Sequence, residues 1–290
     1  MKTMLRWLVT AFLWTLVACH KPAAVVEEEW VDDQDAFADA LVFADVGMAN
    51  DVTGADDTLA TDTGTPSPPP NVLFIGNSYT YVNDLPAMTA QFAQSAGVKV
   101  QQASVTQGGA TLAVMLAQTE AVTKIAEGGW THVVLQGQSV EPAGDLTNFL
   151  AAAKTLANDV HKVKAQVAFY QTWPRKAGDA LYQQAWTGGT QAALAKLLHD
   201  GYEKAAVQNG GVRVPVGDAW MLTLAKHPEI ELYQGDGSHP VPAGTYLAAC
   251  VFSVTLFGVN PAKVVWAPDG MSMQVASALR QMCRTATEAP

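Results

Sequence analysis

Short apolar runs alternate with longer stretches of helical periodicity along most of this chain. The run NVLFI, which begins at Asn71, precedes a helix predicted from Leu85 to Gly97 with Asp84 as its cap. Further strands are predicted at VKVQQAS (98–104), THVVLQ (131–136), QVAFYQT (166–172) and VRVPVG (212–217), with helices over 112–127, 146–163 and about 182–206. A last segment, AGTYLAACVFSVTLFG (243–258), is apolar all round and is therefore expected to be buried. Strands that alternate with helices predict an α/β fold, a three-layer α/β/α sandwich with a mostly parallel sheet covered on both faces.

The N-terminal segment has a different pattern. Lys2 and Arg6 precede an apolar run that is too short to span a bilayer, which predicts a signal peptide over residues 1–18 and an exported chain. The run ends in LVAC, which resembles a bacterial lipobox and implies a lipid anchor on Cys19. His20 is not aspartate, so the resemblance favours the outer membrane; an ordinary signal cut near Ala18 stays the alternative, and the orientation across the membrane is left open.

Residues 19–70 are predicted to form an acidic, Pro/Thr-rich tether without a fold of its own. Between Lys21 and its end at TDTGTPSPPP the segment adds 12 acidic residues and no basic one, and such sequence buries too little apolar surface to offset its ordering entropy. Residues 71–290, in contrast, hold 14 Lys/Arg and 15 Asp/Glu, against a net charge of −10 for the whole chain. The acidity therefore belongs to the tether. No basic patch in the 71–290 domain points to nucleic acid.

Ser78 is the first candidate for chemistry, because the stretch GNSYT follows the first predicted strand directly. Ligands of parallel sheets bind beyond the carboxyl ends of the strands. The stretch lacks the glycine spacing and the lysine of a phosphate loop, and it is not the G-x-S-x-G elbow. A serine after Gly-Asn is more often a simple turn, so this stretch alone does not decide the function.

The second candidate stretch, GDGSHPVPAGTYLAA, places Asp236 and His239 three residues apart before the last buried segment. A serine hydroxyl attacks an ester only when an imidazole takes its proton and a carboxylate orients that imidazole. The Asp-x-x-His spacing lets both side chains face the same way within one turn. Asp218 in VGDAW, which is expected to open a helix, stays a rival for the orienting role.

These stretches together resemble a known family. Gly76, Asn77, Ser78 and Thr80, with DGSH at 236–239, are similar to the first and last sequence blocks of the SGNH, or GDSL-type, hydrolases. The resemblance implies a flavodoxin-like sheet and a serine esterase without metal or organic cofactor. It assigns Ser78 as nucleophile, His239 as base and then acid, and Asp236 as the group that fixes the imidazole tautomer. The implied partner is an ester substrate, an acylated carbohydrate or another small acyl ester.

The two middle blocks of the family supply oxyanion-hole donors. In TQGGATL the resemblance falls on Gly108, with Gly109 as a near alternative, and the backbone N–H of this glycine would act together with that of Ser78. In QGQS the chain has Gln138 where the family has asparagine, which keeps an amide donor on a longer side chain. Asn77 likewise replaces a more common aspartate. This substituted third block leaves a second hypothesis open, a surface binding module that has lost turnover.

Other side chains are weaker candidates. His132 is expected to be a structural histidine within a strand, and the spacing of the remaining histidines predicts no zinc site. Trp173 and Arg175 in TWPR are interpreted either as a wall of the pocket or as an ordinary loop. Cys250 and Cys283 can pair in an exported chain, but the sequence does not decide it.

Overall fold

The computed structural model describes residues 68–288. The predicted signal peptide, the lipobox with Cys19, and the tether up to residue 67 lie outside the described residues. Of the described helices, none is long and apolar enough to cross a membrane.

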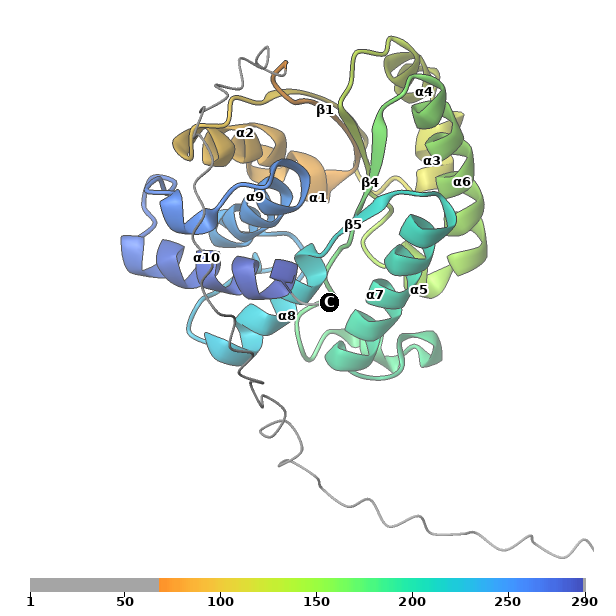
Figure 1. Cartoon of the computed structure of the whole chain (residues 1–290). Helices are drawn as coiled ribbons and strands as arrows, with labels where there is room; N and C mark the ends of the chain where they lie inside the picture. Colours follow the sequence, from red (N-terminus) through yellow and green to blue (C-terminus); the bar gives the residue numbers. More distant parts are fainter. Residues whose placement is uncertain (1–67, 289–290) are drawn as a thin grey trace, which may run out of the picture. The chain divides into compact units, whose positions relative to one another are not determined.

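A five-stranded sheet runs through the middle of the domain, in the order β2-β1-β3-β4-β5 (Figure 1). The strands are β1 (Asn71–Gly76), β2 (Gln101–Thr106), β3 (His132–Leu135), β4 (Gln166–Tyr170) and β5 (Val212–Val214). All four neighbouring pairs are parallel, so their carboxyl ends meet at one edge. This order is the flavodoxin-like order of doubly wound sheets, which confirms the predicted fold class.

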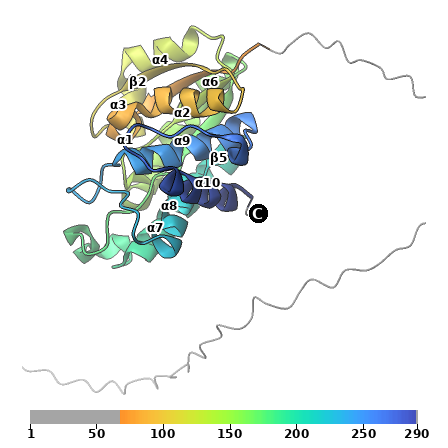
Figure 2. The same cartoon turned by 90° about the vertical axis from the view of Figure 1, so that its left-hand side faces the viewer.

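Helices cover both faces of the sheet (Figures 1 and 2). One face carries α2 (Leu85–Ser95), α8 (Val216–Lys226), α9 (Pro242–Phe257) and α10 (Met273–Glu288). The other carries α3 (Leu112–Ala117), α4 (Thr119–Ala126), α6 (Leu146–Lys162) and α7 (Gln191–Gln208). The short helices α1 (Ser78–Tyr81) and α5 (Glu141–Gly144) follow β1 and β3 at the edge where the carboxyl ends of the strands lie.

The first strand shows why the sheet needs a cover on both sides. Val72 and Phe74 pack into the core beneath α2 and α9, whereas Leu73 and Ile75 pack into the core beneath α3 and α6. All four side chains are buried, because successive side chains of a strand point to opposite faces. The continuous apolar run NVLFI is therefore typical of a central parallel strand.

Two predicted helices differ from the observed ones. The helix predicted over 112–127 is interrupted at Gln118, whose backbone is extended (φ −83°, ψ 121°), so two shorter helices form. The helix predicted from about residue 182 begins only at Gln191, after two short 3-10 turns. Gly188 and Gly189, with φ of 73° and 76°, lie in the left-handed region and delay its start. The capping role of Asp84 is confirmed, since its Oδ1 accepts from Ala87 N at 3.2 Å.

Cys250 of α9 and Cys283 of α10 form a disulfide, with their Cα atoms 6.1 Å apart. The sequence left this pairing open. Both side chains are fully buried in the core on the α9 face. The bridge closes a loop of 33 residues, which corresponds to a stabilisation of about 3 to 4 kcal/mol in the chain-entropy description.

Candidate active site

Ser78 is the first residue of α1, directly beyond the end of β1. Asn77 caps this helix, because its backbone is extended and its Oδ1 accepts from Tyr79 N at 3.1 Å. Gly76 leaves room for two side chains that pack against the backbone here, since a Cβ would lie 2.5 Å from Gln136 Oε1 and 2.6 Å from Thr80 Oγ1. The strand-to-helix turn thus holds Ser78 at the edge where parallel sheets bind ligands.

Asn77 also ties together the loops that follow three strands. Its Nδ2 donates to the carbonyl oxygens of Ala110, after β2, and of Gly137, after β3, at 3.0 and 3.1 Å. The fully buried Gln136 completes the network, since its Oε1 accepts from Asn77 N and Thr80 Oγ1. An ionised aspartate has no hydrogen to donate to two carbonyls. The departure from aspartate therefore has a structural reason, which the sequence did not reveal.

The turn before α9 brings Asp236 and His239 to Ser78. Asp236 Oδ1 accepts from the backbone N–H groups of Ser238 and His239, both at 2.9 Å, while its Oδ2 lies 2.5 Å from His239 Nδ1. The other ring nitrogen, Nε2, lies 2.8 Å from Ser78 Oγ. Gly237 makes this turn possible with φ at 65°. The three side chains thus form one hydrogen-bonded row across 161 residues of sequence.

The turn stabilises the ionised form of the Asp236 carboxylate. Burial opposes the ionised form, but the hydrogen bonds from the His239 ring and from two backbone N–H groups outweigh it and lower the pKa of Asp236 to about 2. Asp236 is therefore ionised at neutral pH. An ionised carboxylate at Nδ1 keeps the proton on that nitrogen and leaves Nε2 free to accept from the serine.

Stacked aromatic side chains pack against the turn that carries Asp236 and His239. Tyr79 stacks on Trp173 at 4.4 Å between ring centroids, and Trp173 stacks on Trp220 at 4.0 Å. Tyr79 Oη lies 2.8 Å from Ser238 Oγ, and Trp173 Nε1 donates to the Ser238 carbonyl at 3.0 Å. Trp173 is fully buried, so it carries the histidine loop rather than lining the cavity.

A cavity of about 190 Å³ opens beside the serine and is lined by Ser78, His239, Gly109, Gln138, Ser139 and Arg175 among others. Of the two candidate glycines, Gly109 belongs to this lining, whereas a Cβ on Gly108 would point toward Tyr81 Oη at 3.1 Å. Within residues 68–288 the backbone N–H groups of Ser78 and of both glycines donate to no protein acceptor. These donors are therefore available to a ligand, and the lining favours Gly109 over Gly108.

Gln138 lines the same cavity but is partly engaged with its own loop. Its Oε1 accepts from Val140 N at 3.0 Å, and its Nε2 donates to Ser139 Oγ at 2.9 Å, which leaves a second Nε2 hydrogen. The backbone beneath it is clamped by Glu141, whose carboxylate accepts from Gln138 N and Leu112 N at 2.8 and 3.1 Å. Burial raises the pKa of Glu141 although both backbone bonds act against this. Glu141 thus links the loops after β2 and β3, a role that the sequence did not indicate.

Asp218 lies in the first turn of α8, as expected, but it does not hold His239. Its carboxylate contacts His199 Nδ1 at 3.0 Å and also accepts from Arg213 and Gln171. Burial opposes the ionised form of Asp218, and the bonds from Gln171, Arg213 and His199 outweigh it and lower its pKa. Asp218 is thereby excluded as the partner of His239.

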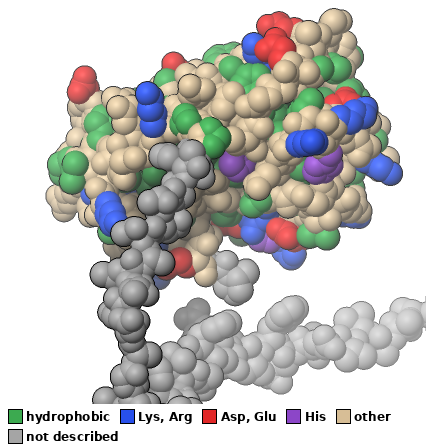
Figure 3. Space-filling model, turned by 45° about the horizontal axis from the view of Figure 1, so that its top comes forward, with side chains coloured by type: hydrophobic (Ala, Val, Ile, Leu, Met, Phe, Trp, Pro, Cys, Tyr) green, Lys and Arg blue, Asp and Glu red, His purple; other side chains and the backbone are tan. Residues whose placement is uncertain are grey.

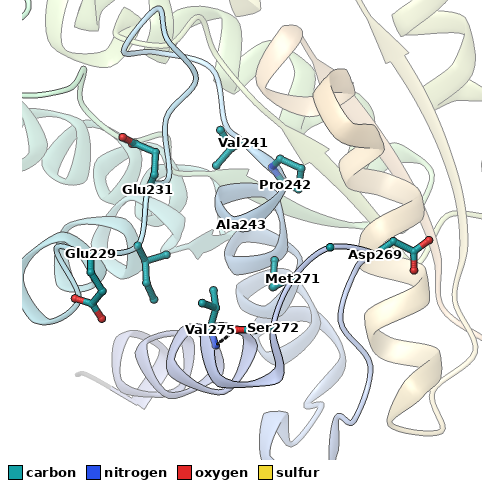
Figure 4. Close-up of a pocket in the computed structure, with 11 residues that line it drawn as sticks. Glu229, Glu231, Val241, Pro242, Ala243, Asp269, Met271, Ser272 and Val275 are labelled. Atoms are coloured by element: carbon teal, nitrogen blue, oxygen red, sulfur yellow. Dashed lines mark hydrogen bonds between the residues drawn. The ribbon is translucent and has the colours of Figure 1, made fainter.

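A second cavity, of about 470 Å³, lies between the segment after α8 and the start of α10 (Figure 4). The carboxylates of Glu229, Glu231 and Asp269 lie at the periphery of this cavity, and its apolar lining includes Met271 and Val275. Its lining contains no histidine, so it offers no counterpart to the serine-histidine row.

In the part of the chain that the structure describes, no group of three or more His, Cys, Asp or Glu side chains is placed to hold a metal ion. Acidic and basic side chains are interspersed on the face drawn in Figure 3.

Comparisons with known proteins place the chain in a family. No family model and no curated protein matches it. A solved structure from Slackia heliotrinireducens, assigned to the SGNH hydrolases, is 30% identical over 65% of this chain and 100% of that one, with a TM-score of 0.55. A DUF4886 family protein from Bacteroides uniformis (18% identity, 76% and 95% coverage, TM-score 0.65) and a variant acetyl-xylooligosaccharide esterase from a Geobacillus species (14%, 65% and 94%, 0.51) share the fold. The chain belongs to the SGNH, or GDSL-type, family of ester hydrolases.

Proposed function

We propose that this chain is a serine esterase that hydrolyses short acyl esters through an acyl-enzyme intermediate. The observation that carries the proposal is the row Ser78 Oγ, His239 Nε2, His239 Nδ1 and Asp236 Oδ2, joined at 2.8 and 2.5 Å beside a cavity. This is the arrangement that activates a hydroxyl nucleophile: a base within hydrogen-bond reach, and a carboxylate that orients the base.

In the first half of the reaction Ser78 Oγ attacks the acyl carbon while His239 Nε2 takes the hydroxyl proton. Asp236 stabilises the resulting imidazolium through Nδ1–H without taking the proton itself. When the tetrahedral intermediate collapses, the C–O bond to the alcohol breaks and the imidazolium returns its proton to the leaving oxygen. A water molecule then repeats the attack on the acyl-enzyme, with His239 again as base and then as acid.

The negative oxygen of each tetrahedral intermediate needs preorganised donors. We assign the backbone N–H groups of Ser78 and Gly109 to this task, with Gly108 as the alternative, and the second Nε2 hydrogen of Gln138. The Asn77 bonds to Ala110 and Gly137 fix the loops that carry these donors. Such rigidity matters because donors that are already oriented cost no reorganisation when charge develops.

The small cavity supports short acyl groups. Its volume of about 190 Å³ lies below the roughly 300–1,000 Å³ of sites that enclose drug-sized ligands, so a long acyl chain does not fit inside it. A fold neighbour named for acetylated xylooligosaccharides acts on esters of this size on a polar carrier. Rates on p-nitrophenyl esters of increasing acyl length test the point, and a maximum beyond about six carbons would contradict it.

The second candidate function is an SGNH-fold binding module without turnover. The observation in its favour is that Gln138 bonds to Ser139 and Val140 of its own loop. A fluorophosphonate probe decides between the two functions, because it labels an activated serine. Labelling of the wild-type protein and none of Ser78→Ala supports the esterase; equal absence of labelling in both supports the binding module.

We also propose that the mature protein is exported and held in the cell envelope, at the outer membrane, by a lipid on Cys19. The Cys250–Cys283 disulfide supports export, because disulfides persist in oxidising compartments. Cys19→Ala should move the protein from the membrane fraction to the soluble fraction and leave esterase activity intact. Wild-type protein that is soluble and carries no lipid mass would remove this proposal.

A further inference from the structure

A guanidinium group stands on the wall of the active-site cavity without a carboxylate partner. Arg175 lines the cavity together with Ser78 and His239. Its Nη2 donates to Ser139 Oγ at 3.3 Å, and its buried Nε has no hydrogen-bond partner among residues 68–288. No Asp or Glu oxygen of those residues lies within 4.0 Å of its nitrogens. A guanidinium on a cavity wall, with a buried N–H group that lacks an acceptor, is suited to bind an anionic ligand.

The carboxylates near this loop are engaged with other groups. Asp236 is held by His239, and Asp179 Oδ1 accepts from Leu181 N at 2.8 Å. Glu231 pairs with Lys176, the neighbour of Arg175, at 2.5 Å. The two adjacent cationic side chains therefore differ in their partners. Lys176 forms an ion pair with Glu231 on the exposed surface, whereas Arg175 lines the cavity and has no carboxylate partner within residues 68–288.

The backbone that carries Arg175 is fixed from several sides. Its carbonyl accepts from the Tyr182 hydroxyl and from Gln191 Nε2, the latter at 2.9 Å. The carbonyl of the preceding Pro174 accepts from Tyr233 Oη at 2.9 Å. A side chain on such a support is presented to the cavity at a defined place rather than on a mobile loop.

We propose that Arg175 binds a carboxylate of the substrate, so that the enzyme prefers short esters that carry a carboxylate close to the scissile bond. A guanidinium binds a carboxylate through two parallel N–H bonds, which suits an arginine better than a lysine. Arg175 and Ser78 line the same small cavity, so an anion bound at Arg175 lies within a few bonds of the carbon that Ser78 attacks. This inference rests on the proposed function, because the same molecule must meet Ser78.

The experiment compares esters in matched pairs. Monomethyl succinate against methyl butyrate places the carboxylate on the acyl side, and 4-acetoxybenzoate against 4-acetoxybenzamide places it on the alcohol side. For at least one pair, wild-type kcat/KM should be about 10-fold higher for the charged ester, since hydrogen bonds to charged groups are the strong ones. Arg175→Gln should lower kcat/KM for that ester by about 10- to 100-fold and leave its neutral partner within about twofold. Arg175→Lys should keep part of the preference.

Lys176→Gln is the matched control, because it removes the same charge one residue away from an exposed pair. It should leave the charged-to-neutral ratio unchanged. The proposal is overturned if wild type shows no preference in either pair, if Arg175→Gln slows both members equally, or if Lys176→Gln removes the preference as well. If Arg175→Gln does not fold, the proposal is tested on the wild-type protein alone. Its ratio of kcat/KM for the charged ester to kcat/KM for the neutral ester should then decrease as the salt concentration rises. Failure of the esterase itself is distinct, because the neutral esters would then react no faster than with Ser78→Ala.

Discussion

Two histidine-aspartate pairs of this domain have similar local geometry and different surroundings. His239 Nδ1 lies 2.5 Å from Asp236, and His199 Nδ1 lies 3.0 Å from Asp218. The second nitrogen of His239 meets Ser78 Oγ at 2.8 Å beside a cavity. The Asp218 carboxylate instead forms an ion pair with Arg213 in addition to its hydrogen bond with His199.

The difference shows that an Asp–His hydrogen bond does not by itself mark an active site. What distinguishes the first pair is the serine hydroxyl at the far nitrogen and the nearby backbone N–H groups that donate to no acceptor within residues 68–288. The second pair is one corner of an ion network between α7 and α8, with Gln171 beneath it. Its role is the attachment of these helices to the end of β4.

The largest expected effect tests the nucleophile and its base. Ser78→Ala and His239→Ala should each lower kcat by about 10⁴- to 10⁶-fold, and the double variant should be no slower than either single one, because the groups act as a unit. His199→Ala is the matched control from the second pair and should keep kcat within about twofold. Initial rates on p-nitrophenyl acetate give the comparison, and additive losses would contradict a shared role.

The next effect separates the two aspartates. Asp236→Asn should reduce kcat by roughly 10⁴-fold, because an amide at Nδ1 favours the wrong imidazole tautomer. Asp218→Asn should leave kcat nearly unchanged. Circular dichroism spectra of both variants show whether the fold is kept. Collapse of activity in Asp218→Asn, with Asp236→Asn near normal, would reverse the assignment of the two pairs.

Gln138 should give an intermediate effect. If its second Nε2 hydrogen meets the oxyanion, Gln138→Ala lowers kcat about 10²- to 10³-fold with little change in KM, because the donor acts on charge that exists only in the transition state. Gln138→Asn should rescue part of this loss, since the amide is kept on a shorter side chain. Gln102→Ala, an exposed glutamine of the edge strand β2, is the control. Wild-type kcat in Gln138→Ala would mean that the amide serves its own loop alone.

The layers of the fold could be predicted from the sequence because each strand and long helix carries a local signal. The run NVLFI and the spacing of apolar residues in α6 depend on burial alone, and the structure places α6 at Leu146–Lys162, close to the predicted 146–163. The strand order was implied by the family resemblance rather than by periodicity. Strand pairing joins segments that are distant in sequence, and no local pattern specifies it.

The site was predictable to the extent that its geometry is local. Asp236 and His239 share one turn, so their spacing alone indicated that they meet. Glu141 gave no such signal, because it acts on loops from two other strands. The position of Arg175 after the fourth strand indicated only that it could line the pocket, and its contact with Ser139 depends on the loop after β3. The choice between Gly108 and Gly109 likewise depended on how the loop after β2 turns at the cavity.

The smallest expected effect concerns stability at acid pH, where the two pairs differ again. The pKa of Asp236 is about 2 in the fold, below its ordinary value of 3.8, so its ionised form stabilises the fold above pH 3.8 and this contribution is lost as the pH falls toward 2. The side chain is 47% exposed, and the contribution is therefore on the order of 0.5 kcal/mol. The pKa of Asp218 is also lowered, and its side chain is less exposed, at 32%, with Arg213 as a cationic partner and His199 as a hydrogen-bond partner. Asp218→Asn should therefore lower the melting temperature at pH 7 more than Asp236→Asn does, the reverse of their order in kcat. Thermal unfolding at pH 7 and pH 3 tests this, and a larger loss in Asp236→Asn at pH 7 would show that the Asp236–His239 pair carries the greater share of stability.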